Sequence, residues 1–148
     1  MRPEGRVAIV TGGAGGLGSA TARHLAAIGM RVVVFDRDGD RAGEIAKELG
    51  DVSTAVRGDA TVDEDASAAI DAASSLGPLS LLVNVAGGAT GGGRTIGRDG
   101  TPHDKAVFVD TMQMNAVGTF NMTRLAAAAM AGNDPDEEGE RGVVVNTA

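Results

Sequence analysis

The fold is decided by one stretch near the amino terminus, Val7-Ala8-Ile9-Val10-Thr11-Gly12-Gly13-Ala14-Gly15-Gly16-Leu17-Gly18. It opens with a continuous apolar run, which is typical of a strand whose sheet is covered by helices on both faces. Glycines let the backbone turn sharply and approach a bound group without Cβ clashes. A helix that begins there would offer unpaired N–H groups and its positive dipole end to an anion. The stretch therefore predicts a strand, a glycine loop and a helix that together hold a phosphate group.

Two glycine registers fit a dinucleotide pyrophosphate, Gly13-x-Gly15-x-x-Gly18 and Gly12-x-x-x-Gly16-x-Gly18. The loop has no Gly-Lys-Ser/Thr sequence, so a P-loop for nucleoside triphosphates is disfavoured. The alternative interpretation is a glycine-rich turn between a strand and a helix that binds nothing.

Strand-like and helical patterns alternate outward from this stretch. Short apolar runs predict strands over 6–10, 31–35, 52–56, 79–85 and 143–145, and helical spacing predicts helices over 16–28, 40–49, 66–76 and 111–130. This order predicts an α/β, Rossmann-type doubly wound parallel sheet with right-handed crossovers and strand order 3-2-1-4-5.

Two local details of the helices are also expected. The first helix is predicted to place Leu17, Ala20, Ala27 and Ile28 near one apolar stripe, beside Leu25. Thr61-x-x-Glu64 has the spacing of a capping box before the third helix. The glycine-rich, polar segment 86–104 is expected to be a functional or mobile loop.

Composition narrows the class of protein. The chain has 148 residues, which suits a single domain over 1–148, and its 13 Lys+Arg against 20 Asp+Glu give a net charge of -7. This charge disfavours nucleic acid and anionic membranes as partners. The apolar runs are too short to cross a membrane, and the first residues lack a secretory or transit signal. We therefore expect a cytoplasmic protein that binds no nucleic acid and no membrane.

Metal chemistry is not expected from this sequence. There is no Cys, which excludes disulfides, Cys-ligated zinc and iron–sulfur clusters. His24 and His103 have no carboxylate at ligand spacing. The acidic segment 134–140 lacks the spacing of an EF-hand and is interpreted as a solvated loop.

Two aspartates follow the second and third expected strands. The carboxylate of Asp36 can accept hydrogen bonds from both ribose hydroxyls of an adenosine and would repel a 2′-phosphate, which favours NAD over NADP. Arg37 weakens this preference, because an Arg there could bind that phosphate. Asp59 lies just before Thr61, where it is either part of the site or a loop Asp near a helix start.

The order and spacing of six motifs resemble those of the short-chain dehydrogenases/reductases. These motifs are the glycine loop 11–18, Asp36, Gly58-Asp59, Asn84-Val85-Ala86-Gly87, Asn115 and the segment 143–148. The resemblance covers essentially the whole chain and selects the second glycine register. It implies an oxidoreductase that moves a hydride between a nicotinamide and a secondary alcohol or ketone.

The resemblance also implies roles for individual residues. Gly12, Gly16 and Gly18 would bind the cofactor pyrophosphate, with Leu17 in the intervening loop. Asp36 would select NAD, Asp59 would contact the adenine, and Ala86 and Gly87 would lie beside the adenosine ribose. Asn115 would hold a water in the proton relay.

A narrower likeness is to the type II 3-hydroxyacyl-CoA dehydrogenases. It rests on the segments 84–87, 94–103, 115–121 and 139–142. This likeness implies oxidation of a short or branched 3-hydroxyacyl-CoA by NAD. The full-length form would be a homo-oligomer, because the family often pairs the long helix across a dimer interface.

The last residues carry a further expectation. The fifth strand is followed by nothing that could cover it, so we expect the front part of a larger domain, without its C-terminal strands and catalytic segment. The family's catalytic Ser would follow residue 148, with a Tyr-x-x-x-Lys pair later. The chain has no Tyr, so it lacks the family's proton donor and is expected to be inactive. The alternatives are a non-catalytic dinucleotide-binding module and a truncated product with no stable fold.

Overall fold

Strand β1 (Val7–Thr11) lies at the centre of a five-stranded parallel sheet with the order β3-β2-β1-β4-β5. The computed structural model describes residues 2–147, so Ala148 of the expected segment 143–148 lies outside the described residues. The other strands are β2 (Arg31–Asp36), β3 (Thr54–Arg57), β4 (Leu79–Asn84) and β5 (Val143–Asn146). The predicted α/β doubly wound sheet and its strand order are confirmed.

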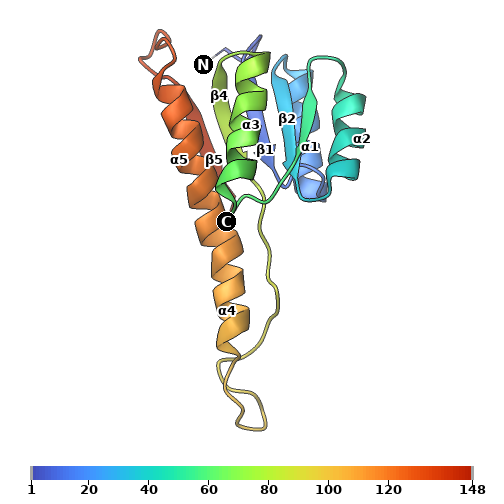
Figure 1. Cartoon of the computed structure of the whole chain (residues 1–148), viewed down its shortest axis with the longest axis vertical. Coiled ribbons are helices and arrows are strands. Elements are labelled where there is room, and N and C mark those ends of the chain that lie inside the picture. The colour runs from blue at the N-terminus through green and yellow to red at the C-terminus, as the bar shows by residue number, and fades with distance from the viewer. Residues whose placement is uncertain (1, 148) are drawn as a thin grey trace.

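Helices cover both faces of this sheet (Figure 1). One apolar core joins the strands to α1 (Gly16–Ala27) and α2 (Gly39–Leu49), and a second joins them to α3 (Asp63–Leu76) and α5 (Gly118–Ala131). Neighbouring residues of β1 belong to different cores: Val10 lies in the first and Ile9 in the second. Both faces therefore need apolar side chains, which explains why the strands are continuous apolar runs.

Helix α1 buries a different face from the one predicted. Its buried residues are Gly18, Ser19, Ala22 and Leu25. Leu17 is 61% exposed and Ile28 is 41% exposed, so the predicted stripe is wrong. The close packing of Gly18 against the backbone of Gly12 fixes the rotation of the helix, and this leaves the larger apolar residues at its two ends in solvent.

The predicted capping box before α3 is also wrong. The N-cap residue is Val62, which makes no side-chain cap hydrogen bond. The hydroxyl of Thr61 donates instead to Asp59 Oδ1 at 2.8 Å, and the Thr61 backbone N–H donates to the same oxygen at 2.9 Å. The sequence pattern predicted that the Thr61 hydroxyl caps α3, but this hydroxyl is hydrogen-bonded to Asp59 instead.

The last helical segment is longer than predicted. It runs without a break through α4 (Lys105–Met112), a π-helical turn η1 (Gln113–Val117) and α5. It begins at Lys105 because the carboxylate of Asp104 accepts a hydrogen bond from the Ala106 backbone N–H at 2.8 Å. Helix α4 and the segment 86–104 project beyond the sheet at the carboxyl ends of the strands (Figure 1). Within residues 2–147, no helix is both long enough and apolar enough to cross a membrane.

Candidate functional site

A cleft of about 390 Å³ opens at the carboxyl ends of β1, β2, β3 and β4. The cleft lies beside β1, at the point where the strand order reverses. Open α/β sheets bind ligands in the crevice at this point. The eight residues predicted to bind a cofactor all line it: Gly12, Gly16, Leu17, Gly18, Asp36, Asp59, Ala86 and Gly87. The fold therefore brings together residues from four separate segments of the chain.

Two glycines of the loop are required by the packing of the chain itself. Gly12 has a φ of 64°, and a Cβ on it would lie 2.8 Å from the backbone nitrogen of Ala86. A Cβ on Gly18 would lie 2.0 Å from the carbonyl oxygen of Gly12. These contacts fix the glycine loop against the segment that follows β4 and against the first turn of α1.

Gly16 is different, because the fold does not need it. Apart from its chain neighbours and the backbone of its own helix, no described atom lies within 4 Å of the place that its Cβ would take. It is the first residue of α1, and it lines the cleft. The missing side chain keeps the cleft open at the N-terminus of α1, where backbone N–H groups and the helix dipole favour an anion.

Thr11 and Asn84 belong to motifs noted in the sequence, but the sequence pattern assigned neither residue a role of its own, and neither lines the cleft. The buried hydroxyl of Thr11 accepts hydrogen bonds from the backbone N–H groups of Val85 at 3.1 Å and Ala86 at 3.0 Å. The Asn84 amide donates to Asn146 Oδ1 at 2.9 Å, which links β4 to β5. Both are polar residues at the end of an apolar strand, and this position was the signal that could have pointed to their contacts.

Asp36 lies at the end of β2 and faces the glycine loop. Its carboxylate accepts hydrogen bonds from the backbone N–H of Ala14 at 3.0 Å and of Asp38 at 3.0 Å. These two bonds hold the half-buried carboxylate in the wall of the cleft. Each oxygen keeps a second acceptor site, so the group can still accept hydrogen bonds from a ligand.

Asp59 sits across the cleft on the segment after β3. Its Oδ1 accepts the two hydrogen bonds from Thr61, and its Oδ2 lies 3.5 Å from Arg37 Nη1. The pKa of Asp59 is lowered, chiefly because the Thr61 backbone N–H donates to it. Partial burial opposes this change, while the Thr61 hydroxyl and the charge of Arg37 lower the pKa further.

The lowered pKa of Asp59 predicts how stability depends on pH. We expect Asp59→Asn to be less stable than the parent chain above pH 3.8, the ordinary pKa of this group. The folded-state pKa is the lower one, so the contribution of ionised Asp59 is present above 3.8 and disappears as the pH falls through the folded value. Urea melts of both proteins across this range measure the difference, and a gap that stays constant into acid would contradict the assignment.

Asn115 lies in the π-helical turn η1, beside the cleft rather than in its wall. Its Oδ1 accepts a hydrogen bond from the Gly88 backbone N–H at 2.9 Å, and its Nδ2 donates to the carbonyl oxygens of Gly88 at 2.6 Å and Thr111 at 2.7 Å. The side chain is thus tied to the start of the segment 86–104. Its predicted part in a proton relay stays a prediction.

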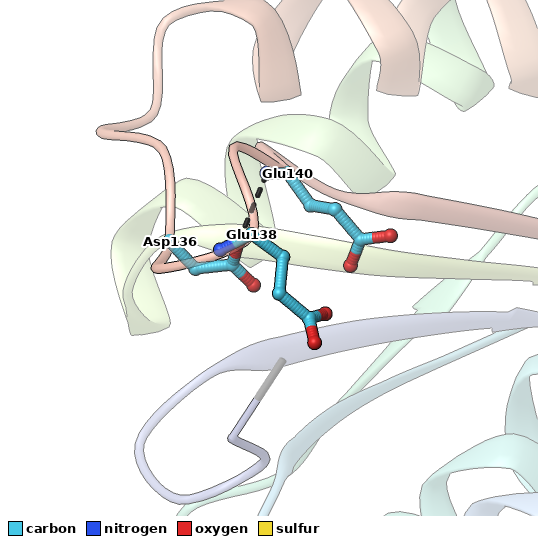
Figure 2. A group of neighbouring side chains, drawn as sticks. All are labelled: Asp136, Glu138 and Glu140. Atoms are coloured by element: carbon cyan, nitrogen blue, oxygen red, sulfur yellow. Dashed lines mark hydrogen bonds between the residues drawn. The ribbon is translucent and has the colours of Figure 1, made fainter.

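The acidic segment lies at the other end of the sheet. Asp136, Glu138 and Glu140 come just before β5 and bring one carboxylate oxygen each within 4.8 Å of one another (Figure 2). Asp136 accepts hydrogen bonds from the backbone N–H groups of Glu138 at 3.0 Å and Glu140 at 2.9 Å, which lowers its pKa. The glutamates are exposed. These contacts describe a hydrogen-bonded surface turn, and the prediction that the chain holds no metal stays a prediction.

The fold and the cleft together define an α/β protein with the architecture of nucleotide-binding domains. The sequence model of one family, described as short chain dehydrogenase, matches residues 6–148. The chain therefore belongs to the short-chain dehydrogenase family, whose members are oxidoreductases.

Relatives with known names agree with this family. The chain is 44% identical over 143 residues to the 3-hydroxyacyl-CoA dehydrogenase type-2 of Drosophila melanogaster and 37% identical over 146 residues to that of Homo sapiens. These alignments cover 96% and 98% of this chain but 56% of each relative. The chain thus spans little more than half the length of the curated relatives that it matches.

Solved structures show the same likeness. The 3-hydroxyacyl-CoA dehydrogenase type-2 from Mycobacterium avium is 43% identical and superposes with a TM-score of 0.94, over 97% of this chain and 56% of that one. The 3-ketoacyl-(acyl-carrier-protein) reductase from Brucella melitensis, solved in complex with NADH, is 31% identical with a TM-score of 0.83. That alignment covers 98% of this chain and 57% of that one.

Proposed function

We propose that this chain is an NAD-binding domain and that its cleft holds the adenosine and pyrophosphate parts of the cofactor. The open space at Gly16 carries the proposal, because the fold leaves it empty at the anion-binding end of α1. The pyrophosphate would lie against Gly12, Gly16, Leu17 and Gly18. A relative of similar fold binds NADH, which supports a nicotinamide dinucleotide as the ligand.

The remaining cleft residues receive the adenosine in this proposal. Asp36 would accept hydrogen bonds from the ribose hydroxyls, and its charge would repel a 2′-phosphate, so NAD is preferred to NADP. Asp59 would contact the adenine on the opposite wall. Ala86 and Gly87 would lie beside the ribose, where Thr11 fixes the backbone of Ala86.

The reaction of the whole protein is proposed by analogy with its relatives. Bound NAD would take a hydride from a secondary alcohol or return it to a ketone, and a 3-hydroxyacyl-CoA is the substrate class that the relatives' names support. Asn115 would hold the segment 86–104 at Gly88 and contribute to the proton relay. We also propose that the full-length form is a homo-oligomer.

Binding is tested by the thermal stability of the 148-residue chain. We expect a cooperative melt whose midpoint rises with NAD concentration, because a ligand at 100 times its Kd stabilises the folded state by about 2.7 kcal/mol. Nicotinamide mononucleotide lacks the adenosine and should shift the midpoint much less. A broad melt that NAD leaves unchanged would count against the proposal.

Turnover is a separate question, because the 148-residue chain contains no Tyr. A tyrosine proton donor is therefore not available within it, and general acid–base catalysis contributes roughly 10²–10⁴-fold in rate. We expect this chain to bind NAD without oxidising a 3-hydroxyacyl-CoA, as a non-catalytic binding module would. NADH absorbance measures the reaction, and formation of NADH well above a protein-free control would refute the expectation.

A further inference from the structure

Arg37 is the one basic residue among the described residues that line the cleft. It follows Asp36 directly, so it is the cation closest in sequence to the proposed ribose site. A 2′-phosphate on that ribose would need such a cation, because Arg pairs strongly with phosphate oxygens. Its neighbours therefore decide whether the cleft can accept NADP.

The guanidinium of Arg37 is already engaged on the far side of the cleft. Its Nη1 lies 3.5 Å from Asp59 Oδ2, and its Nη2 donates a hydrogen bond to Met114 Sδ at 3.5 Å. Asp59 is itself held by Thr61 and is the less exposed partner, with 34% of its side chain accessible against 66% for Arg37. The carboxylate is thus the fixed member of the pair and Arg37 the movable one.

We propose that Asp59 is a selectivity-determining residue that withholds Arg37 from a 2′-phosphate and so favours NAD over NADP. The inference rests on the proposed function, because it assumes that the ribose lies at Asp36. Two carboxylates then act against a 2′-phosphate in different ways. Asp36 repels it directly, and Asp59 occupies the cation that would otherwise bind it.

The test is a double-mutant cycle of Asp59→Asn and Arg37→Gln. NAD and NADP are the probes, because they differ only in the 2′-phosphate. Calorimetric titration gives the two Kd values for each protein, and the ratio Kd(NADP)/Kd(NAD) cancels any contact that Asp59 makes with the adenine. Asn can still accept the hydrogen bond of the Thr61 backbone N–H, so Asp59→Asn keeps the turn.

We expect Asp59→Asn to lower the ratio by about two- to five-fold, which is the range for an exposed ion pair. Arg37→Gln should barely change the ratio in the parent chain, but it should cancel the gain in the Asp59→Asn background. Asp40→Asn is the matched control, because it removes an equal charge from the first turn of α2, outside the cleft wall. It should leave the ratio unchanged.

Three results would overturn the inference. In the first, Asp59→Asn leaves the ratio unchanged. In the second, the gain persists after Arg37→Gln, which would make it a general effect of charge or of another cation. In the third, Arg37→Gln alone raises the ratio strongly. This would show that Arg37 already binds the 2′-phosphate in the parent chain, although Asp59 is present. Failure of the parent chain to bind NAD would overturn the proposed function as well, whereas NAD binding with an additive cycle would overturn this inference alone.

Discussion

Gly18→Ala is expected to destabilise the fold strongly and to abolish NAD binding. The added methyl would lie 2.0 Å from the Gly12 carbonyl oxygen and 2.9 Å from the Gly13 Cα. Both are backbone atoms, so no flexible side chain can move aside. Overpacking costs about 1–3 kcal/mol and occasionally more, and a clash with backbone belongs at the upper end. Urea melts measure the loss of stability, and NAD titration measures the loss of binding.

Gly16→Ala is the matched control two residues away. Its methyl meets no described atom within 4 Å outside its chain neighbours and the backbone of its own helix, and Ala is a better helix former than Gly. Stability should therefore be unchanged or slightly higher, while the methyl takes space in the cleft and weakens NAD binding. Normal NAD binding by Gly16→Ala would show that the pyrophosphate does not lie at the N-terminus of α1, and a stable, NAD-binding Gly18→Ala would contradict the close backbone contact.

The strands were predictable because burial on both faces of the sheet requires continuous apolar runs, which are visible in the sequence. The predicted run 31–35 and the observed β2 (Arg31–Asp36) differ by one residue, and the predicted 52–56 is shifted by two residues at its start from β3 (Thr54–Arg57). The strand order followed from alternation with helices and from the handedness of their crossovers. Neither argument needs a detailed side-chain contact, which is why both were confirmed.

The helices were less predictable, because contacts from outside each helix decide their details. Gly18 packs against the Gly12 backbone, and this contact sets which face of α1 is buried. That face is not the one that the apolar residues of the helix predict. The Thr61 hydroxyl donates a hydrogen bond to Asp59 and so does not cap the N-terminus of α3. Helix α4 has no buried residue, and Phe108 is 59% exposed, so hydrophobic spacing gave no signal over 105–110.

For the site, the sequence could place residues at strand ends but could not show which groups they contact. Asp36 was expected at the site from its place at the end of a strand, whereas Asp59 was placed there only by the family resemblance, because its position alone also fitted a loop Asp near a helix start. The hydrogen bond from the Ala14 backbone N–H to Asp36 and the ion pair of Arg37 with Asp59 join distant parts of the chain. Those partners depend on loop geometry that no local pattern encodes.

Asp36→Ala is expected to weaken NAD binding by about 10- to 150-fold, the range for losing hydrogen bonds to a charged group. Binding of NADP should weaken less, because the substitution also removes a charge that repels the 2′-phosphate. The structure adds a second effect, since the Ala14 backbone N–H loses its acceptor and the glycine loop is less firmly held. That loss affects both cofactors equally, so the ratio of the two Kd values isolates the ribose contact.

Asp36→Asn separates the two effects further. It keeps one carbonyl oxygen that can accept the Ala14 N–H, but it lacks the charge and one of the two acceptors. We expect Asp36→Asn to be closer in stability to the parent chain than Asp36→Ala is. Its preference for NAD over NADP should fall by a similar amount. Calorimetric titration with both cofactors and urea melts supply the measurements. Equal losses of NAD and NADP affinity in both variants would refute the ribose contact, and Asp36 would then serve only to hold the glycine loop.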